Sequence, residues 1–361
     1  MSKIVSIATG VPPYKHNQSD ICIFANNIYC DNETDSRKLK FLYRHSGIDT
    51  RYSVMRDYSV LPSDREFYEK NEDLEPFPCL EKRMKWYADH AAMLSVKTIE
   101  SCIAGKIDKK DITHLITVSC TGLSAPGLDL EVMELMELNM NIFRTSVNFM
   151  GCYAAIHALK MADAFCKNDA KANVLIVCTE LCTLHFQKEY TVDNITSSLL
   201  FSDGSAAILV SGDNEQEGLT ISHFYSLIEA KGKKDMAWQL SSSGFRMTLT
   251  SYVADLIESS FDEITTKALV AGGLDKKEIT HWCIHPGGKK ILEAVHNSLG
   301  FTNGQLQYSY DILKQYGNMS SATILFVLKD MMSALDKTRD NRILGAAFGP
   351  GLTIETFILS A

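Results

Sequence analysis

Three side chains at turns in this 361-residue sequence could together carry nucleophilic chemistry. Cys152 follows a glycine and begins the run GCYAAIHALKMA, His285 ends the strand-like run THWCIH, and Asn318 follows Gly317 ahead of MSSATILFVLKDMM. A cysteine with a histidine and an amide fits acyl transfer from thioesters. In that chemistry His285 and Asn318 would donate hydrogen bonds to a thioester oxygen and stabilise the enolate formed when a malonyl group loses CO2. Singly, each residue also has a structural interpretation, such as a core cysteine or a helix-capping asparagine.

The elements around these residues explain how they could meet. The β-branched run at residues 142–149 predicts a strand or extended approach to a tight turn, and a helix beginning at Cys152 would favour the thiolate through its free N–H groups and dipole. A Pro-Gly-Gly turn follows His285, which directs this histidine to a cavity at the end of a buried strand.

A repeat indicates that the chain is a duplicated α/β protein. DKKDITH begins at residue 108 and DKKEITH at residue 275, while the dipeptides Gly-Cys and Gly-Asn begin at residues 151 and 317, so the two offsets agree within one residue. We therefore predict two halves, residues 1–215 and 216–361, whose helix starts converge on one site. Periodicity predicts strands at 3–10, 115–119, 173–178, 206–211, 219–225, 282–284, 343–347 and 352–359, helices at 19–30, 36–43, 81–104, 253–271 and 288–299, and a loop-like segment at 51–78.

Composition excludes several classes of protein. The formal charge of −8 argues against nucleic-acid or anionic-membrane partners. Ten cysteines without framework or zinc spacing predict a reduced, cytoplasmic protein. No stretch predicts a signal peptide or membrane insertion.

Four segments carry a family resemblance: GCYAA, IHPGGKKIL, YGNMSSATILFVL and AAFGPGLTIETF. They resemble the type III polyketide synthases, the chalcone synthase-like branch of the thiolase superfamily, over nearly the whole chain. SCTGLSAP and ELCTLHFQ look like bacterial members. The resemblance implies an α/β thiolase fold with duplicated halves in αβαβα layers, and a homodimer. It also implies loading of an acyl-CoA or acyl-carrier starter on Cys152, iterative decarboxylative condensation with malonyl-CoA, and closure to a pyrone, resorcinol or polyhydroxynaphthalene, with no metal or redox cofactor.

The resemblance also implies further site residues. Phe201 matches the phenylalanine between the CoA tunnel and the cavity, and Met247 replaces a second one. The position of a methionine that reaches across the plant dimer holds Ala125. The other pocket positions match Cys120, Cys182, His185, Trp238 and Ser320, and the signature loop matches Gly349, Pro350 and Gly351.

Three of these assignments each have a second interpretation. Cys120 is either a buried strand-end cysteine or a second cysteine of the kind found in naphthalene-forming members. Trp238 either packs in the core or shortens the cavity. CoA would meet basic residues near the N-terminus, for which Lys38, Lys40, Arg44 and Arg51 are available, although these residues could equally form a solvated face.

Two rival functions remain at this stage. One is an initiating ketoacyl synthase (ketoacyl synthase III-like), or another CoA-dependent Claisen enzyme, that performs a single condensation. The other is a catalytically silent thiolase-fold subunit that binds acyl-CoA. The complete Cys-His-Asn set favours an enzyme over the second rival.

Overall fold

A nine-stranded mixed sheet forms the frame of the protein. The computed structural model describes residues 2–302, 304–336 and 338–361. From one edge to the other the strands are β11 (His281–Ile284), β12 (Arg342–Gly349), β13 (Thr353–Ser360), β8 (Leu219–Ile228), β1 (Lys3–Gly10), β7 (Asp203–Ser211), β6 (Asn173–Leu181), β4 (His114–Ser119) and β5 (Phe143–Asn148).

The sheet consists of two blocks with the same strand order and directions. In the series β4-β6-β7-β1 the first pair is parallel and the next two are antiparallel, and β11-β12-β13-β8 repeats this pattern. Two residue pairs, Lys3 with Thr220 and Ile4 with Leu219, join the blocks through β1 and β8. β5 extends the first block as a parallel edge strand.

The repeated sequence motif makes the same hydrogen bonds in both blocks. Thr113 donates its N–H to the Asn173 carbonyl at 3.0 Å, and its hydroxyl accepts the Asn173 N–H at 2.9 Å. Thr280 forms the equivalent pair with Arg342, at 2.9 Å for both bonds. The sequence repeat is therefore also a structural repeat, while the division into residues 1–215 and 216–361 stays a prediction.

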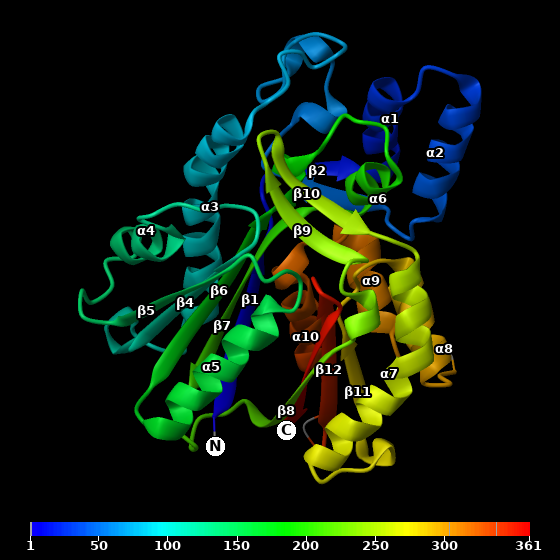
Figure 1. Cartoon of the computed structure of the whole chain (residues 1–361). Helices are drawn as coiled ribbons and strands as arrows, with labels where there is room; N and C mark the ends of the chain where they lie inside the picture. The colour runs from blue at the N-terminus through cyan, green and yellow to red at the C-terminus, as the bar shows by residue number, and fades with distance from the viewer. Residues whose placement is uncertain (1, 303, 337) are drawn as a thin grey trace.

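Helices form three layers around the two strand blocks, as Figure 1 shows from left to right. In the centre, α5 (Ala154–Asn168) and α10 (Thr323–Ala334) share one buried cluster with strand residues of both blocks. The outer helices belong to a second cluster on the opposite faces of the strands. This is the predicted αβαβα layering, with outer helices α3 (Leu80–Ile103) and α4 (Leu128–Leu135) on one side and α7 (Tyr252–Ala271) and α8 (Lys289–Ser298) on the other.

A lobe covers one end of the sheet, at the top of Figure 1. Sequence periodicity missed its hairpin of β9 and β10, together with helices α4, α6 and α9, whereas residues 51–78 are mostly irregular as predicted. The lobe contains β2 (Tyr14–Asn17), α1 (Gln18–Tyr29), α2 (Glu33–His45), β3 (Thr50–Ser53), α6 (Val192–Leu200), β9 (Met236–Ser241) and β10 (Gly244–Leu249), and α9 (Gln307–Tyr316) lies beside β3.

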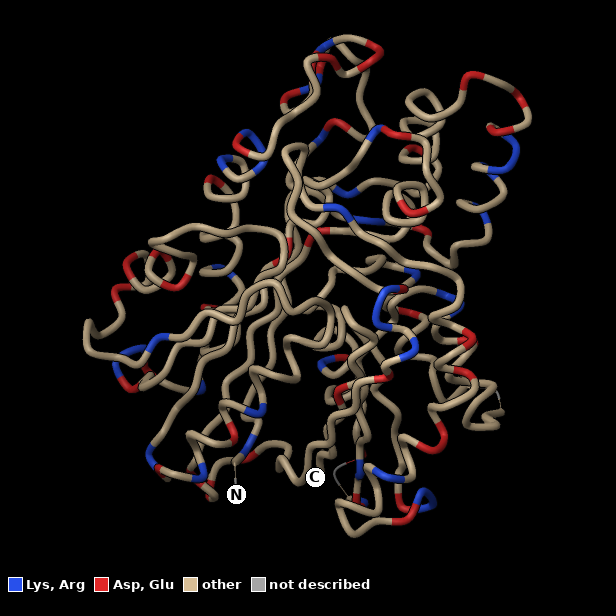
Figure 2. Tube along the Cα trace, in the orientation of Figure 1, with Lys and Arg blue, Asp and Glu red and all other residues tan. Residues whose placement is uncertain are grey.

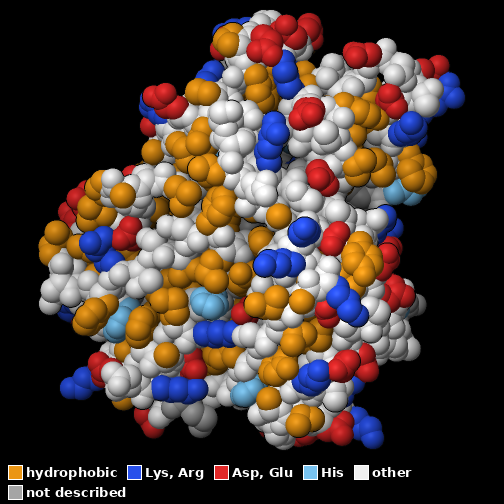
Figure 3. All heavy atoms as spheres, viewed as in Figure 1, with side chains coloured by type: hydrophobic (Ala, Val, Ile, Leu, Met, Phe, Trp, Pro, Cys, Tyr) orange, Lys and Arg blue, Asp and Glu red, His pale blue; other side chains and the backbone are white. Residues whose placement is uncertain are grey.

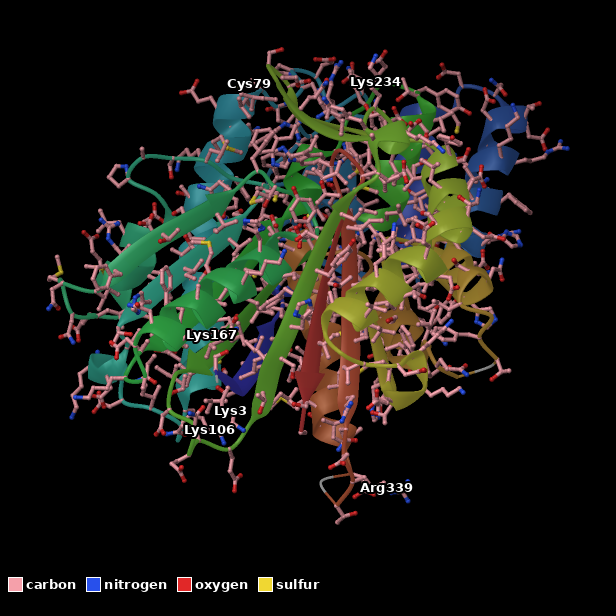
Figure 4. The ribbon with its side chains drawn as sticks, turned by 60° about the horizontal axis from the view of Figure 1, so that its bottom comes forward. Lys3, Cys79, Lys106, Lys167, Lys234 and Arg339 are labelled. Carbon is pink, nitrogen blue, oxygen red and sulfur yellow. The ribbon has the colours of Figure 1, made fainter. Side chains whose placement is uncertain are left out.

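Charged residues of both signs are interspersed over the outer helices and loops, and the strands at the centre carry few of them (Figure 2). Lys3, Lys106, Lys167 and Arg339 lie at the end of the molecule opposite the lobe, whereas Cys79 and Lys234 lie near it (Figure 4). No helix among the described residues is long and apolar enough to cross a membrane.

The repeat predicts matched effects of substitution in the two blocks. Ile112 and Ile279 occupy the same motif position and are both buried, so Ile112→Ala and Ile279→Ala should each lower the free energy of unfolding by about 2–4 kcal/mol. Chemical denaturation would measure both losses. The neighbouring exposed residues provide controls, because Lys110→Ala and Lys277→Ala should each change stability by less than about 0.5 kcal/mol. A large loss in one block only would contradict the equivalence.

Candidate functional site

Cys152 lies on a tight turn between β5 and α5. Two residues just before it have positive φ angles, Phe149 at 61° and Gly151 at 91°. A Cβ at Gly151 would lie 2.2 Å from the Pro350 ring, so only glycine allows this turn to pack against the loop after β12. The Gly151 N–H donates to the Cys120 sulfur at 3.0 Å, which fixes the turn from the other side. Strained backbone of this kind is typical of functional sites.

The Asn318 side chain is held by its amide oxygen and donates from its amide nitrogen beside the cavity. The backbone of Asn318 bonds Leu200 and Ser202, each at 2.9 Å, and its Oδ1 accepts the N–H of Ser320 at 2.8 Å. Because the oxygen is engaged, the amide NH2 is the group that remains for other partners, and Nδ2 donates to the Gly287 carbonyl at 3.2 Å. The oxygen of Asn318 therefore makes a local capping contact with Ser320, while its amide nitrogen is the hydrogen-bond donor on the side of the cavity.

His285 follows β11 and is buried with both ring nitrogens unused. Its backbone N–H donates to Ala346 at 2.8 Å, which continues the pairing with β12. The side chain is 1% exposed, and neither Nδ1 nor Nε2 has a hydrogen-bond partner among the described residues. Buried polar atoms are normally paired, so an imidazole without partners suggests a ligand-facing role. Burial lowers the pKa of His285 to about 3, which keeps the ring neutral.

One cavity brings most of the predicted residues together. Cys152, His285 and Asn318 line it from three different elements. Of the other predicted residues, Phe201, Met247, Cys120, Cys182, Trp238, Ser320 and Pro350 line it, and so do Thr121, Gly151, Met236, Leu249, Gly287, Ile291 and Phe348.

The signature loop shapes one wall of this cavity. Pro350 lies on the wall, and Gly349 approaches the Tyr153 ring so closely that a Cβ there would lie 2.5 Å from it. Gly351 has a φ of 76°, which favours glycine at the turn. The loop thus presses against the turn that carries Cys152.

The expectation that a helix start favours the Cys152 thiolate is wrong for the resting site. Helix α5 begins at Ala154, two residues after the cysteine, and Cys152 is buried. Burial raises the pKa of the thiol to about 12, although the Ser320 hydroxyl, 3.8 Å from the sulfur, opposes the rise because it can donate to the thiolate. Desolvation therefore outweighs the field of the helix.

Two other assignments need correction. His185 lines a neighbouring cavity rather than the one with Cys152. Its Nε2 bonds the Thr121 carbonyl at 2.8 Å and its Nδ1 accepts the Phe245 N–H at 3.1 Å, so the ring is a structural tie. Arg51 is buried and donates hydrogen bonds to Phe201 and Gln18. It is therefore not one of the exposed basic residues that were expected to bind CoA.

The remaining basic residues lie on α2 at the surface. Lys38, Lys40 and Arg44 are exposed, and Lys38 pairs with Asp35 of the same helix at 3.2 Å. Their contact with CoA stays a prediction.

Glu180 is a buried residue near the site that the sequence reading missed. Its Oε2 accepts from the Cys120 N–H and the Thr121 hydroxyl, both at 2.9 Å, and its Oε1 accepts from the Ser321 hydroxyl at 2.5 Å. Burial raises the pKa of this carboxyl group. It links turns from both halves of the chain. The signal was present, since a glutamate inside the strand-like run VLIVCTEL is unusual for a buried strand.

The described residues contain no group of three or more His, Cys, Asp and Glu side chains arranged to hold a metal ion.

Comparisons with known proteins agree with this architecture. Residues 1–214 match the family profile "Chalcone and stilbene synthases, N-terminal domain", and residues 224–361 match the corresponding C-terminal domain. "Alpha-pyrone synthesis polyketide synthase-like Pks18" of Mycobacterium tuberculosis is 30% identical, with 98% of this chain and 89% of that protein aligned. "Probable polyketide synthase 1" of Dictyostelium discoideum is 29% identical over 98% of this chain, which spans only 11% of that longer protein.

A solved structure confirms the thiolase fold. The polyketide synthase PKS-I of the brown alga Ectocarpus siliculosus superimposes with a TM-score of 0.91 at 25% identity, covering 99% of this chain and 97% of that one. Together, the two family profiles and the M. tuberculosis relative confirm the predicted resemblance. The chain belongs to the type III polyketide synthases, the chalcone and stilbene synthase family of acyltransferases.

Proposed function

We propose that the cavity loads an acyl group from CoA or a carrier thioester onto Cys152, extends it repeatedly with malonyl-CoA, and closes the product to a ring. The observation that carries this proposal is the cavity lined together by a thiol, an unpaired imidazole and an oriented amide. The ring would be of the pyrone, resorcinol or polyhydroxynaphthalene type.

Loading begins with a proton transfer from the Cys152 thiol to His285. Burial disfavours each charged form alone, but the transfer creates thiolate and imidazolium together, and their attraction offsets part of the desolvation cost. The sulfur then attacks the thioester carbonyl, a new S–C bond replaces the old one, and the leaving CoA thiolate takes the proton from His285. His285 returns to its neutral form.

Extension uses His285 and Asn318 as two neutral donors. They bind the thioester oxygen of malonyl-CoA, so the C–C bond to its carboxylate breaks, CO2 leaves, and the electron pair remains as an enolate. The enolate carbon attacks the acyl group on Cys152, forming a C–C bond while the S–C bond breaks and the thiolate is released. The fixed orientation of the Asn318 amide supports this role, since its oxygen is held by Ser320 and cannot turn toward the enolate.

The walls of the cavity would limit the length of the product. Trp238 donates its Nε1–H to the Cys120 carbonyl at 2.8 Å, which holds the indole across the cavity. Phe201 and Met247 form the neighbouring wall. This supports the interpretation that Trp238 shortens the cavity, and it gives Cys120 a role in positioning that wall.

The proposal includes CoA contacts by Lys38, Lys40 and Arg44 and action in the cytoplasm. It also includes no requirement for a metal or redox cofactor, because neither loading nor extension needs one to accept or donate electrons.

The proposal also includes a homodimer. In support, β5 is an edge strand with Phe143 72% exposed, and nearby Met140 is 78% exposed. Figure 3 shows hydrophobic side chains gathered on the side of the molecule with α3, α4 and α5. Light scattering that gives a monomeric mass would contradict this part.

The deciding experiment incubates the purified protein with malonyl-CoA, alone and with a ladder of acyl-CoA starters, and identifies the products by mass spectrometry. Cyclised products with two or more malonyl-derived units are expected. A single β-ketoacyl product would favour the one-step ketoacyl synthase. A folded protein that forms no acyl adduct on Cys152 and releases no CO2 would favour the silent acyl-CoA-binding subunit.

Cys152→Ala separates the two half-reactions. We expect this variant to form no polyketide, because the acyl acceptor is missing, while CO2 release from malonyl-CoA continues through His285 and Asn318. Radiolabelled malonyl-CoA would follow both products in one assay. Chain extension by the variant would show that another group carries the acyl chain.

His285→Gln tests the proton transfer. An amide cannot take the thiol proton, so burial alone would set the pKa of Cys152, and alkylation of Cys152 by iodoacetamide near pH 7 should slow at least about tenfold. Peptide mass spectrometry would give the rate at each cysteine. Cys79, which is exposed, serves as the internal control and should react at the same rate in both proteins. An unchanged rate at Cys152 would exclude His285 as the proton acceptor.

A further inference from the structure

A second cavity borders the one that contains Cys152. The two cavities share four lining residues: Cys182, Phe201, Trp238 and Met247. Cys182 has the smallest side chain of the four, so it fills the least of the boundary between the cavities. An acyl chain attached at Cys152 that exceeds the first cavity would extend into the second.

The second cavity has a polar lining at its far side. Helix α6 contributes Asn194, Ser197 and Ser198, which share one face of the helix, and β3 contributes Arg51 and Ser53. The hydroxyls of Ser197 and Ser198 donate to backbone carbonyls of α6 and leave their oxygens as acceptors. The Ser53 hydroxyl bonds Thr183 and accepts the Met55 N–H. These groups are largely engaged within the protein.

Arg51 differs, because one of its nitrogens has no acceptor. Nε donates to Gln18 at 2.9 Å and Nη1 to the Phe201 carbonyl at 2.6 Å. Nη2 is buried and has no acceptor in hydrogen-bond geometry among the described residues, although the neutral Tyr43 hydroxyl lies close enough to interact with the guanidinium, and the residue as a whole is 3% exposed. Arg65 and Arg83 are also buried with one unpaired nitrogen each, but they do not line this cavity.

The charge of Arg51 is also uncompensated by a direct ion pair. No carboxylate forms a salt bridge with it in the described parts of the chain, and both partners of its hydrogen bonds are neutral oxygens. Asp203 acts on it at longer range, but its two oxygens already accept from Val54 and Thr183. A guanidinium remains protonated in proteins, and its burial without a counter-ion is costly. A carboxylate in the cavity would supply both the missing acceptor and the missing charge.

We infer that the second cavity binds the carboxylate at the far end of an acyl chain whose thioester end reacts at Cys152. The enzyme then prefers starters derived from dicarboxylic acids over equally long starters with an uncharged end. This inference rests on the proposed function of Cys152 and adds the class of starter to it.

The first test uses the native protein, so it does not depend on the folding of a variant. Matched pairs of acyl-CoA starters of equal chain length would end either in a free carboxylate or in its methyl ester. For chains long enough to enter the second cavity, kcat/KM should be at least tenfold higher with the carboxylate. Equal values, or a preference for the ester, at every length would overturn the inference.

Variants at Arg51 then locate the preference. Arg51→Met should bring the ratio between carboxylate and ester starters close to one, and Arg51→Lys should retain part of it, because the charge remains without the forked geometry. Because both starters are measured on the same variant, this ratio is unaffected by any general loss of activity that follows from breaking the contact with Phe201. Arg37→Met, which removes an exposed charge from α2, is the matched control and should keep the native ratio. A native ratio in Arg51→Met would assign the preference to another residue and overturn the inference.

The outcome also distinguishes this inference from the proposed function. If no starter forms an adduct on Cys152, the proposed function fails. If starters load and are extended but the charge at their far end has no effect, only the carboxylate site is excluded.

Discussion

The site depends on the buried central layer, in which α5 and α10 both pack against strands of the two blocks. Alanines at 154, 155, 158 and 162 of α5 are completely or almost completely buried, so the helix approaches its neighbours closely. Small side chains in a close-packed layer leave little freedom for either helix to slide or rotate. The turns before the two helices are therefore held at one end of this layer, and they carry Cys152 and Asn318. The catalytic geometry is a consequence of this core, and a change in the central layer would disturb the site without touching any side chain in it.

Hydrogen bonding distinguishes the buried structural residue Glu180 from the proposed reactive residue His285. Glu180 is as buried as His285, yet its two oxygens accept three hydrogen bonds from Cys120, Thr121 and Ser321. These bonds connect a turn of the first half to a turn of the second half and thus stabilise the junction at which the cavity forms. His285 has no such bonds and leaves both nitrogens to a ligand. Buried polar groups are costly when they are unpaired. The contrast with Glu180 therefore indicates that His285 is the residue whose hydrogen-bond partner would be supplied by the substrate in the proposed reaction.

The sequence alone was sufficient for the features that depend on local residue types. Cys152, His285 and Asn318 follow or precede glycine-rich turns in recognisable segments, and the DKK-ITH repeat revealed the duplication. Features that depend on long-range contacts were not accessible. His185 and Arg51 were assigned by position to the pocket and to CoA, but their direction and burial come from contacts with residues more than 30 positions away, such as Thr121 and Phe201. The ionisation of Cys152 was misjudged for the same reason, because a helix start is local whereas desolvation is a property of the whole cavity.

Under the proposed function, chemistry and product size would be controlled by different parts of the fold. The reactive groups follow elements of the nine-stranded sheet and its central helices, which tolerate little movement. Trp238 and Met247 instead lie opposite each other on the two-stranded sheet of β9 and β10, where cross-strand neighbours contact each other directly. A substitution at either position changes the room available to the other and alters the wall shared by the two cavities. This hairpin could therefore change the size of the product while the geometry of Cys152, His285 and Asn318 is preserved, so the motifs that identify the reaction carry no information about where the growing chain stops.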